Sequence, residues 1–209
     1  MAHPPLDAGH TLGPYTLSEA ARPRFRCYLA HALAEEDRPV TLRLFEPGAL
    51  TPSEIRALKE RIQSCSRIPE RPELIRCTGL QVEDEWVILS LSRMNGQPLP
   101  EFIASKNLSW SPTEALEKVG QLASALGSAH REGLIHGGIC PEQILVEATG
   151  TLQLTGLELP DFLHAAPARI HYRSPEQLSP LSNAVDGRTD IYGSGAVLYE
   201  VLTGTAITL

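Results

Sequence analysis

Residues 136–145 read HGGICPEQIL, and this stretch decides the fold of the chain. Upstream, residues 111–114 (SPTE) form a capping box with proline at the first helical position, which predicts a helix ending near Gly133. The apolar residues expected on one face of this helix are Leu116, Val119, Leu122, Ala123 and Leu126. Downstream, short apolar runs at 144–146 and 152–154 predict two strands joined by a turn. The stretch is therefore a loop between a helix and a strand pair.

The first third of the chain carries the alternating pattern of antiparallel strands. Runs of alternating apolar and polar residues at 15–17, 27–30 and 40–45 are separated by turn-type residues. Residues 51–54 (TPSE) then form a second capping box, and apolar residues follow it at helical spacing. Residues 74–91 return to strand character. This part of the chain predicts a sheet with one inserted helix.

The end of the chain carries a third helical pattern. Residues 190–204 read DIYGSGAVLYEVLTG, and the segment from Asp190 to Leu202 is apolar nearly all round. This pattern is typical of a helix that is buried inside a protein. We therefore expect a buried helix here.

Composition and charge limit the class of protein. The 209 residues are 42% apolar and 21% charged, enough for a core in one domain or in a small lobe plus a larger one. A net charge of -7 and a pI near 5.5 give no basic surface for nucleic acid or anionic lipid. The first residues lack a signal-peptide pattern, and no apolar run is long enough to span a bilayer. We expect a cytoplasmic protein that binds neither nucleic acid nor membrane.

The cysteines do not predict a metal or disulfide framework. Cys27, Cys65, Cys77 and Cys140 form no C-x-x-C pair and have no histidine at zinc spacing. This favours reduced thiols, which also fits a cytoplasmic location. We expect no structural metal.

Taken in order, these motifs resemble the protein-kinase family over residues 13–204. Residues 136–145 resemble its catalytic loop, H-R-D-L-K-P-E-N-I-L; VTLR at 40–43 resembles its V-A-I-K strand; YRSPE at 172–176 matches the end of its activation segment. Residues 190–204 resemble the central helix of bacterial serine/threonine kinases. The resemblance implies an α+β, two-lobed protein-kinase-like fold, with a β-rich N-lobe containing one helix and a mainly helical, C-terminally truncated C-lobe.

The resemblance also implies how the chain is divided. The expected parts are a flexible N-terminus at 1–12, an N-lobe at 13–92, a hinge at 93–98 and a partial C-lobe at 99–209. The family's later helices are absent, so the last helix would expose a large apolar patch. We expect a protein partner or a missing C-terminal continuation to cover it. Glu176 leads to the same expectation, because its usual arginine partner lies in the missing part and an unpaired buried carboxylate is costly.

The catalytic positions of the resemblance carry other residue types. Gly138 stands where the family has its catalytic aspartate, and Cys140 replaces the loop lysine. Gln143 and Gly156 stand where the family has its two magnesium ligands, an asparagine and an aspartate. General base catalysis alone contributes roughly 10²–10⁴-fold, and magnesium would rest on one amide. The resemblance therefore implies no intact catalytic residue, no metal of the kinase type, and no dependence on ATP and magnesium as cofactors.

The nucleotide pocket is expected to survive only as a remnant. Residues 19–26 (EAARPRFR) replace the glycine-rich loop and contain no glycine, so the backbone cannot approach the phosphates closely. Arg43 replaces the strand lysine, and Glu60 is a better candidate than Glu54 for its helix partner. Arg43, Glu60 and Leu91 are the residues that would line this remnant.

The retained residues have structural roles in the family. The resemblance implies that His136 and Leu157 fill a buried column, that Asp190 binds the backbone of the catalytic loop, and that Glu176 anchors the activation segment. Gly137 replaces the arginine that binds a phosphorylated activation loop, and residues 157–171 contain no Ser, Thr or Tyr. Activation by phosphorylation is therefore not expected.

Three functional hypotheses follow. The first is a catalytically inactive protein-kinase-like domain, a pseudokinase, that serves as a binding, scaffold or allosteric regulatory module. The second is a divergent ATP-dependent serine/threonine protein kinase with relocated metal ligands at Glu158 or Asp161. The third is a truncated kinase remnant with no stable fold of its own.

Overall fold

The computed structural model describes residues 6–22, 27–32, 38–105, 110–160, 163, 167–179 and 185–207. The chain divides into two compact units: Met1–Gln63 with Arg76–Met94, and Ser64–Ile75 with Asn95–Leu209. This differs from the division expected from the sequence, because residues 64–75 belong to the second unit. The physical reason is that Ile68 and Leu74 are buried in that unit's core, where Leu74 also forms a β-bridge with Leu154.

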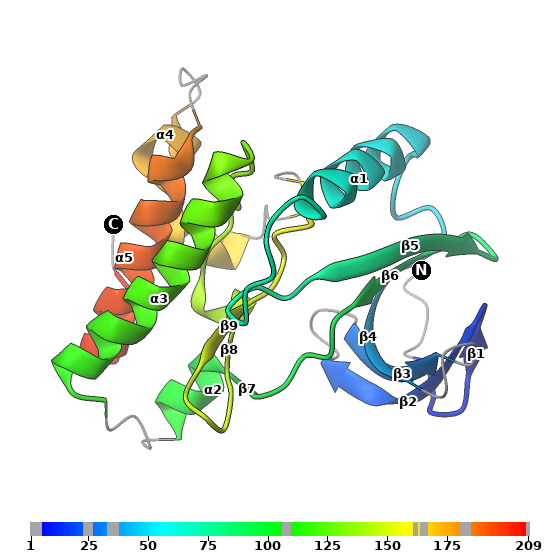
Figure 1. Cartoon of the computed structure of the whole chain (residues 1–209), viewed down its shortest axis with the longest axis horizontal. Helices are drawn as coiled ribbons and strands as arrows, with labels where there is room; N and C mark the ends of the chain where they lie inside the picture. The colour runs from blue at the N-terminus through cyan, green and yellow to red at the C-terminus, as the bar shows by residue number, and fades with distance from the viewer. Residues whose placement is uncertain are drawn as a thin grey trace. The chain divides into compact units, whose positions relative to one another are not determined.

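The first unit is built on a six-stranded antiparallel sheet with the order β1-β2-β3-β4-β6-β5 (Figure 1). The strands are β1 (Thr11–Leu12), β2 (Tyr15–Arg22), β3 (Cys27–Ala32), β4 (Arg38–Phe45), β5 (Cys77–Glu83) and β6 (Trp86–Leu91). One face of the sheet buries an apolar cluster, because side chains alternate between the two faces of a strand. This cluster consists of Leu12, Tyr15, Leu17, Tyr28, Ala30, Ala32, Val40, Leu42, Leu44 and Ile88.

Two features of the first unit bear on the predictions. Residues 1–12 were expected to be flexible, but Thr11–Leu12 pair with Tyr15 and Thr16 as β1, and the side chain of Leu12 is buried. The inserted helix α1 (Pro52–Cys65) begins at the predicted capping box. There Glu54 Oε2 accepts hydrogen bonds from the backbone N–H and the hydroxyl of Thr51, both at 2.7 Å. The local sequence therefore fixes where this helix begins.

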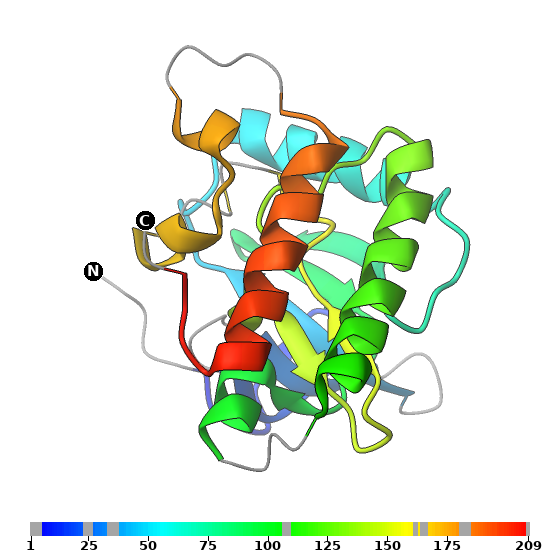
Figure 2. The same cartoon turned by 90° about the vertical axis from the view of Figure 1, so that its left-hand side faces the viewer.

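The second unit is mainly helical and contains a small sheet with the order β7-β8-β9. Its strands are β7 (Gln97–Pro98), β8 (Ile144–Val146) and β9 (Leu152–Leu154). Its helices are α2 (Leu99–Ala104), α3 (Pro112–Arg131), α4 (Pro175–Leu178) and α5 (Gly187–Thr203), with 3₁₀ turns η2 (Pro141–Gln143) and η4 (Pro167–Tyr172). Helices α3 and α5 lie side by side (Figure 2). No helix in the described residues has the length and apolar character needed to cross a bilayer.

Helix α3 buries three of the five residues predicted for its apolar face. Its capping box forms as expected, with Glu114 Oε2 accepting from the backbone N–H of Ser111 at 2.7 Å. Val119, Leu122 and Leu126 are buried as predicted, but Leu116 is 61% exposed and Ala123 is also exposed. The buried stripe runs through Ala115, Val119, Leu122, Leu126 and Ala129. Its steps of four and three residues keep one face inward, and Leu116 and Ala123 each lie one residue off that face.

Helix α5 is buried on one face only, which corrects the prediction of a fully buried helix. Its buried residues are Thr189, Asp190, Gly193, Ser194, Ala196, Val197 and Val201. On the other face, Ile191 is 65%, Tyr199 46% and Leu202 48% exposed. The helix approaches its neighbours closely at Gly193, where a Cβ would lie 3.0 Å from Ile139 Cβ.

Candidate functional site

The loop at residues 136–145 is fixed by the carboxylate of Asp190, near the start of α5. Asp190 is 1% exposed, and its Oδ2 and Oδ1 accept hydrogen bonds from the backbone N–H groups of His136 and Gly137, each at 2.8 Å. His130 Nε2, from the last turn of α3, lies 2.7 Å from Oδ2. A buried carboxylate is tolerated when donors satisfy it in this way. Asp190 thus ties α3, α5 and the loop together.

His136 connects the loop to the end of β9 and is fully buried. Its Nδ1 lies 3.1 Å from the backbone N of Gly138, and its Nε2 lies 2.9 Å from the backbone oxygen of Thr155. A backbone N–H can only donate, so Nδ1 is the acceptor and Nε2 carries the proton that is donated to Thr155. His136 is therefore a neutral imidazole whose two nitrogens hold backbone groups in place.

Gln143 occupies the position expected for a magnesium ligand, and it makes structural hydrogen bonds. Its side chain is buried, and Oε1 accepts from the hydroxyl of Thr155 at 2.7 Å. The backbone N–H of Thr155 also donates to the backbone oxygen of Gln143 at 2.8 Å. The side-chain oxygen of Gln143, which would face a metal ion in a kinase, therefore points toward Thr155.

The three other positions that the kinase resemblance picked out hold two glycines and a cysteine. Gly138 contributes its backbone N–H to His136. Cys140 is buried in a small cluster with Tyr172 and Ala196, so an uncharged side chain fills the position of the family's lysine. Gly156 has a φ of +94° and precedes Leu157, which is buried in the core of the second unit. A positive φ of this size favours glycine over an L residue with a side chain.

The structure describes one of the two carboxylates proposed as replacement metal ligands. Glu158 is buried, immediately after Leu157. Asp161 lies outside the described residues. Within the ranges that the structure describes, no group of three or more His, Cys, Asp or Glu side chains is arranged to hold a metal ion.

The residues expected in the nucleotide remnant belong to the first unit. Arg43 is buried in β4, between Cys27 of β3 and Leu89 of β6. Leu91 is buried at the end of β6, whereas Glu60 lies on the exposed side of α1. The ion pair between Arg43 and Glu60 stays a prediction. Of the segment that replaces the glycine-rich loop, residues 23–26 lie outside the described residues, and the backbone of 19–22 belongs to β2.

Glu176 differs from the expectation of an unpaired buried carboxylate. It is half-buried, and its Oε1 accepts a hydrogen bond from the hydroxyl of Thr189 at 2.8 Å. Hydrogen bonds from its own backbone N–H, and then from Ser174 and Thr189, lower the pKa of its carboxyl. The carboxylate therefore has hydrogen-bond donors in its own helix turn and in Thr189, near the start of α5.

Three residues of this network were missed by sequence reasoning. His130 and Thr155 bind Asp190 and His136 as described, and Gln177 Nε2 donates to the backbone oxygen of Gly137 at 2.7 Å. Gln177 directly follows the YRSPE motif, so its position next to Glu176 was a usable signal. The contacts of His130 and Thr155 depend on tertiary packing.

Comparisons with known proteins agree with this architecture. A family model described as the protein kinase domain matches residues 35–209. The chain is 29% identical over 184 residues to serine/threonine-protein kinase PrkC of Bacillus subtilis, covering 82% of this chain and 28% of that protein. It is 32% identical over 104 residues to serine/threonine-protein kinase PknB of Mycobacterium tuberculosis, covering 45% of this chain and 16% of that protein. The chain therefore spans less than a third of these relatives.

A solved structure supports the fold independently. The kinase domain of Mycobacterium tuberculosis PknI superimposes with a TM-score of 0.79 at 20% sequence identity. The superposition covers 100% of this chain and 80% of that one. The predicted α+β protein-kinase fold, with a sheet-based N-lobe and a helical C-lobe, is confirmed.

Proposed function

Because the chain belongs to the protein kinase domain family, we propose that it is a pseudokinase: a domain that keeps the kinase frame, transfers no phosphate and serves as a cytoplasmic binding, scaffold or regulatory module. The observation that carries this proposal is the state of the catalytic loop. Gly138 offers no base, Gly156 offers no carboxylate, and the amide oxygen of Gln143 accepts a hydrogen bond from Thr155.

Phosphoryl transfer in this family depends on groups that act together. A base accepts the proton of the substrate hydroxyl, and two metal ligands hold magnesium against the phosphates. Here Gly138, Gly156 and Gln143 stand at those three positions. One lost group lowers a rate, but losing the base and the metal ligands together removes both parts of the chemistry.

The retained hydrogen bonds support a role that depends on shape. Asp190 fixes the loop backbone, and His136 fixes the loop against β9. Buried polar groups need partners, so this frame stabilises the domain whether or not the loop is catalytic. A folded domain with a rigid loop and no reactive group is suited to binding.

The expectation of a covering protein partner or continuation belongs to this proposal. Its support is the apolar face of α5 formed by Ile191, Tyr199 and Leu202, each at least 46% exposed. Exposed apolar patches of this kind are typical of surfaces that are covered by other polypeptide.

A divergent serine/threonine kinase is the second candidate. Its support is Glu158, a buried carboxylate two residues after Gly156, together with relatives that are named serine/threonine-protein kinases. This candidate requires Glu158 to bind metal in place of a residue at 156. It also requires nucleotide binding without a glycine-rich loop.

Thermal unfolding with and without ATP and magnesium tests the proposal. A ligand at 100 times its dissociation constant stabilises the native state by about 2.7 kcal/mol, which moves the melting temperature by several degrees. We expect no shift that depends on magnesium. The kinase domain of PrkC is a suitable positive control. A magnesium-dependent shift that disappears in Glu158→Gln would favour the second candidate.

A further inference from the structure

Two arginines of the second unit converge on one buried hydroxyl group. Arg71 lies in the segment that joins α1 to β5, and its Nη2 donates to Ser128 Oγ at 3.2 Å. Arg131 is the last residue of α3, and its Nη2 donates to the same oxygen at 3.0 Å. Ser128 is 1% exposed, whereas Arg71 is half-buried and Arg131 is exposed. The two guanidinium groups are therefore held close together where a ligand can reach them.

The position of Arg71 is fixed by the core of the second unit. Ile68 and Leu74, on either side of Arg71 in sequence, are buried in the same apolar cluster as Ala125 and Ala129 of α3. The backbone N–H of Leu74 also donates to the backbone oxygen of Arg71 at 3.1 Å. The segment is thus packed on α3 over the turn that carries Ser128. A site whose groups are already placed loses less entropy when it binds a ligand.

No carboxylate neutralises these two arginines within the ranges that the structure describes. Glu70, Glu73 and Glu132 lie close to them in sequence, but none forms an ion pair with either guanidinium group. Two cations that share one acceptor repel each other, and an anion bound to both would offset this repulsion. The pair therefore favours an anionic ligand.

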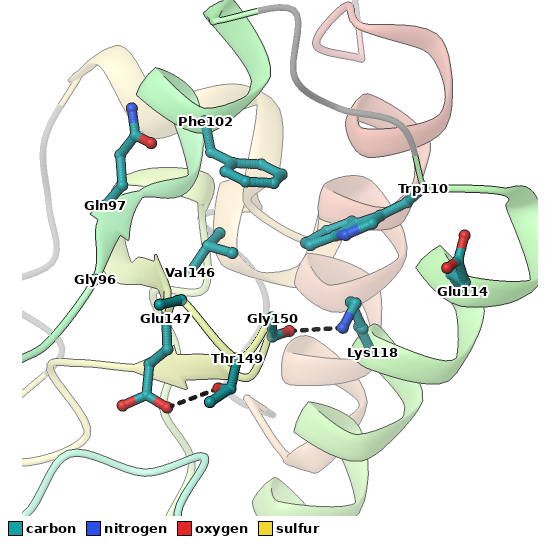
Figure 3. A pocket seen from close by; sticks show the side chains of 11 residues that line it. Gly96, Gln97, Phe102, Trp110, Glu114, Lys118, Val146, Glu147, Thr149 and Gly150 are labelled. Atoms are coloured by element: carbon teal, nitrogen blue, oxygen red, sulfur yellow. Dashed lines mark hydrogen bonds between the residues drawn. The ribbon is translucent and has the colours of Figure 1, made fainter.

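The other cationic side chain of α3, Lys118, has a different environment (Figure 3). It lines an open pocket of about 560 Å³ together with Phe102 and Trp110. Its Nζ donates to the backbone oxygen of Gly150 at 2.7 Å and lies 5.2 Å from the centroid of the Trp110 ring. Lys118 is therefore engaged within the protein. Arg71 and Arg131 each bond to the described residues through one Nη2, and a guanidinium has five N–H donors.

We propose that Arg71 and Arg131 form a binding site for a phosphate dianion. The N–H groups of a guanidinium form a rigid fork that matches two oxygens of a phosphate. A phosphate on a side chain carries a charge of about -1.5 to -2 at neutral pH, which matches two guanidinium groups better than the single charge of a carboxylate does. Ser128 is a positioning residue, because it holds both arginines and is itself buried. The inference does not depend on whether the chain transfers phosphate.

Isothermal titration of the full chain at constant ionic strength tests the proposal. The probes are inorganic phosphate and the capped pentapeptide Ala-Ala-Ser-Ala-Ala with phosphoserine, serine or glutamate at its centre. We expect the phosphoserine peptide to bind at least about tenfold more tightly than the serine and glutamate peptides. Glutamate binding as tightly as phosphoserine, or no binding of either phosphate probe, would overturn the proposal.

Inorganic phosphate separates the two sources of the ligand. A site for a phosphorylated side chain of a polypeptide should bind the phosphoserine peptide more tightly than inorganic phosphate. A site for a small phosphate compound should bind inorganic phosphate at least as tightly as the peptide. Either order supports the phosphate site and assigns its source.

Matched variants locate the site. Arg71→Gln and Arg131→Gln should each weaken binding of the phosphate probes by about tenfold, and Arg71→Lys and Arg131→Lys should weaken it less, because lysine keeps the charge and loses the fork. Arg131 is exposed, so its variants test the site even if a change at Arg71 disturbs folding. Arg56→Gln is the control, because it removes the same charge from the exposed surface of α1. The proposal fails if this control weakens binding as much as Arg131→Gln, or if neither arginine variant changes binding.

Discussion

The backbone of the loop at 136–145 differs from the side chains at the positions that are catalytic in kinases. Polar and charged groups bind the backbone, whereas these positions carry small or uncharged residues. The backbone is fixed by charged and polar groups: Asp190 binds two N–H groups, and His136 binds Gly138 and Thr155. The catalytic side-chain positions hold glycine, a buried cysteine, and a glutamine bonded to Thr155. The hydrogen bonds that fix the loop backbone therefore do not involve the side chains at residues 138, 140 and 143. Mutations of the groups that fix the backbone should therefore lower the free energy of unfolding.

The largest effect is expected at Asp190. Asp190→Ala leaves the N–H groups of His136 and Gly137 and the ring of His130 without their acceptor in the interior. We expect the free energy of unfolding to fall by about 3–5 kcal/mol, measured by urea denaturation. Asp186→Asn is the control on the same helix, because asparagine also caps α5 and residue 186 is half-buried. Equal losses in the two variants would contradict the central position of Asp190.

The next effect is expected at Gly156. Gly156→Asp restores the family's carboxylate, but it places an L side chain at a φ of +94°. We expect a loss of about 1–3 kcal/mol in unfolding free energy, with no phosphate transfer gained. Gly156→Ala separates the backbone strain from the added charge. A Gly156→Asp protein as stable as the parent would show that the backbone is not strained at this position.

A smaller effect on stability is expected from losing the hydrogen bond between the Thr155 hydroxyl and Gln143 Oε1. Thr155→Val removes the hydroxyl and keeps the shape, so Gln143 Oε1 loses its donor in a buried position. We expect a loss of about 1 kcal/mol. Thr151→Val is the control, because Thr151 lies near the exposed turn of the same strand pair. No difference between the two variants would mean that the bond to Gln143 adds nothing to stability.

The smallest effect is expected at the cap of α3, and it depends on pH. The folded state lowers the pKa of Glu114, so its contribution to stability is present above the unfolded pKa and is lost as the pH falls through the folded pKa. The parent protein should be more stable than Glu114→Gln at neutral pH, and the difference should shrink in acid. Denaturation of both proteins across this range checks the sign. A difference that grows in acid would contradict it.

Much of the fold was predictable because its signals are local. The capping boxes at 51–54 and 111–114 fix where α1 and α3 begin, and the alternating runs at 15–17, 27–30 and 40–45 lie in β2, β3 and β4. The order of these elements with the loop at 136–145 was enough to identify the kinase fold.

The parts that were not predictable depend on tertiary packing. The spacing of apolar residues in α3 predicted that Leu116 and Ala123 are buried, but both are exposed in the folded helix. Because α5 is apolar on nearly all sides, its sequence did not show which face is exposed. The hydrogen bond between Thr155 and Gln143 joins residues that are 12 positions apart. The pocket that Trp110 lines is built from four separate segments, at 96–97, 102, 110–118 and 146–150. Such contacts leave no periodic trace in a sequence.

A pseudokinase transfers no phosphate. The most direct test of this proposal is incorporation of labelled γ-phosphate from ATP into the chain and into an acceptor protein, with magnesium or manganese present and a heat-denatured sample as control. We predict no incorporation above the denatured control in the parent protein. Incorporation above that control, abolished by Glu158→Gln, would contradict the proposal and establish a kinase with a relocated metal ligand.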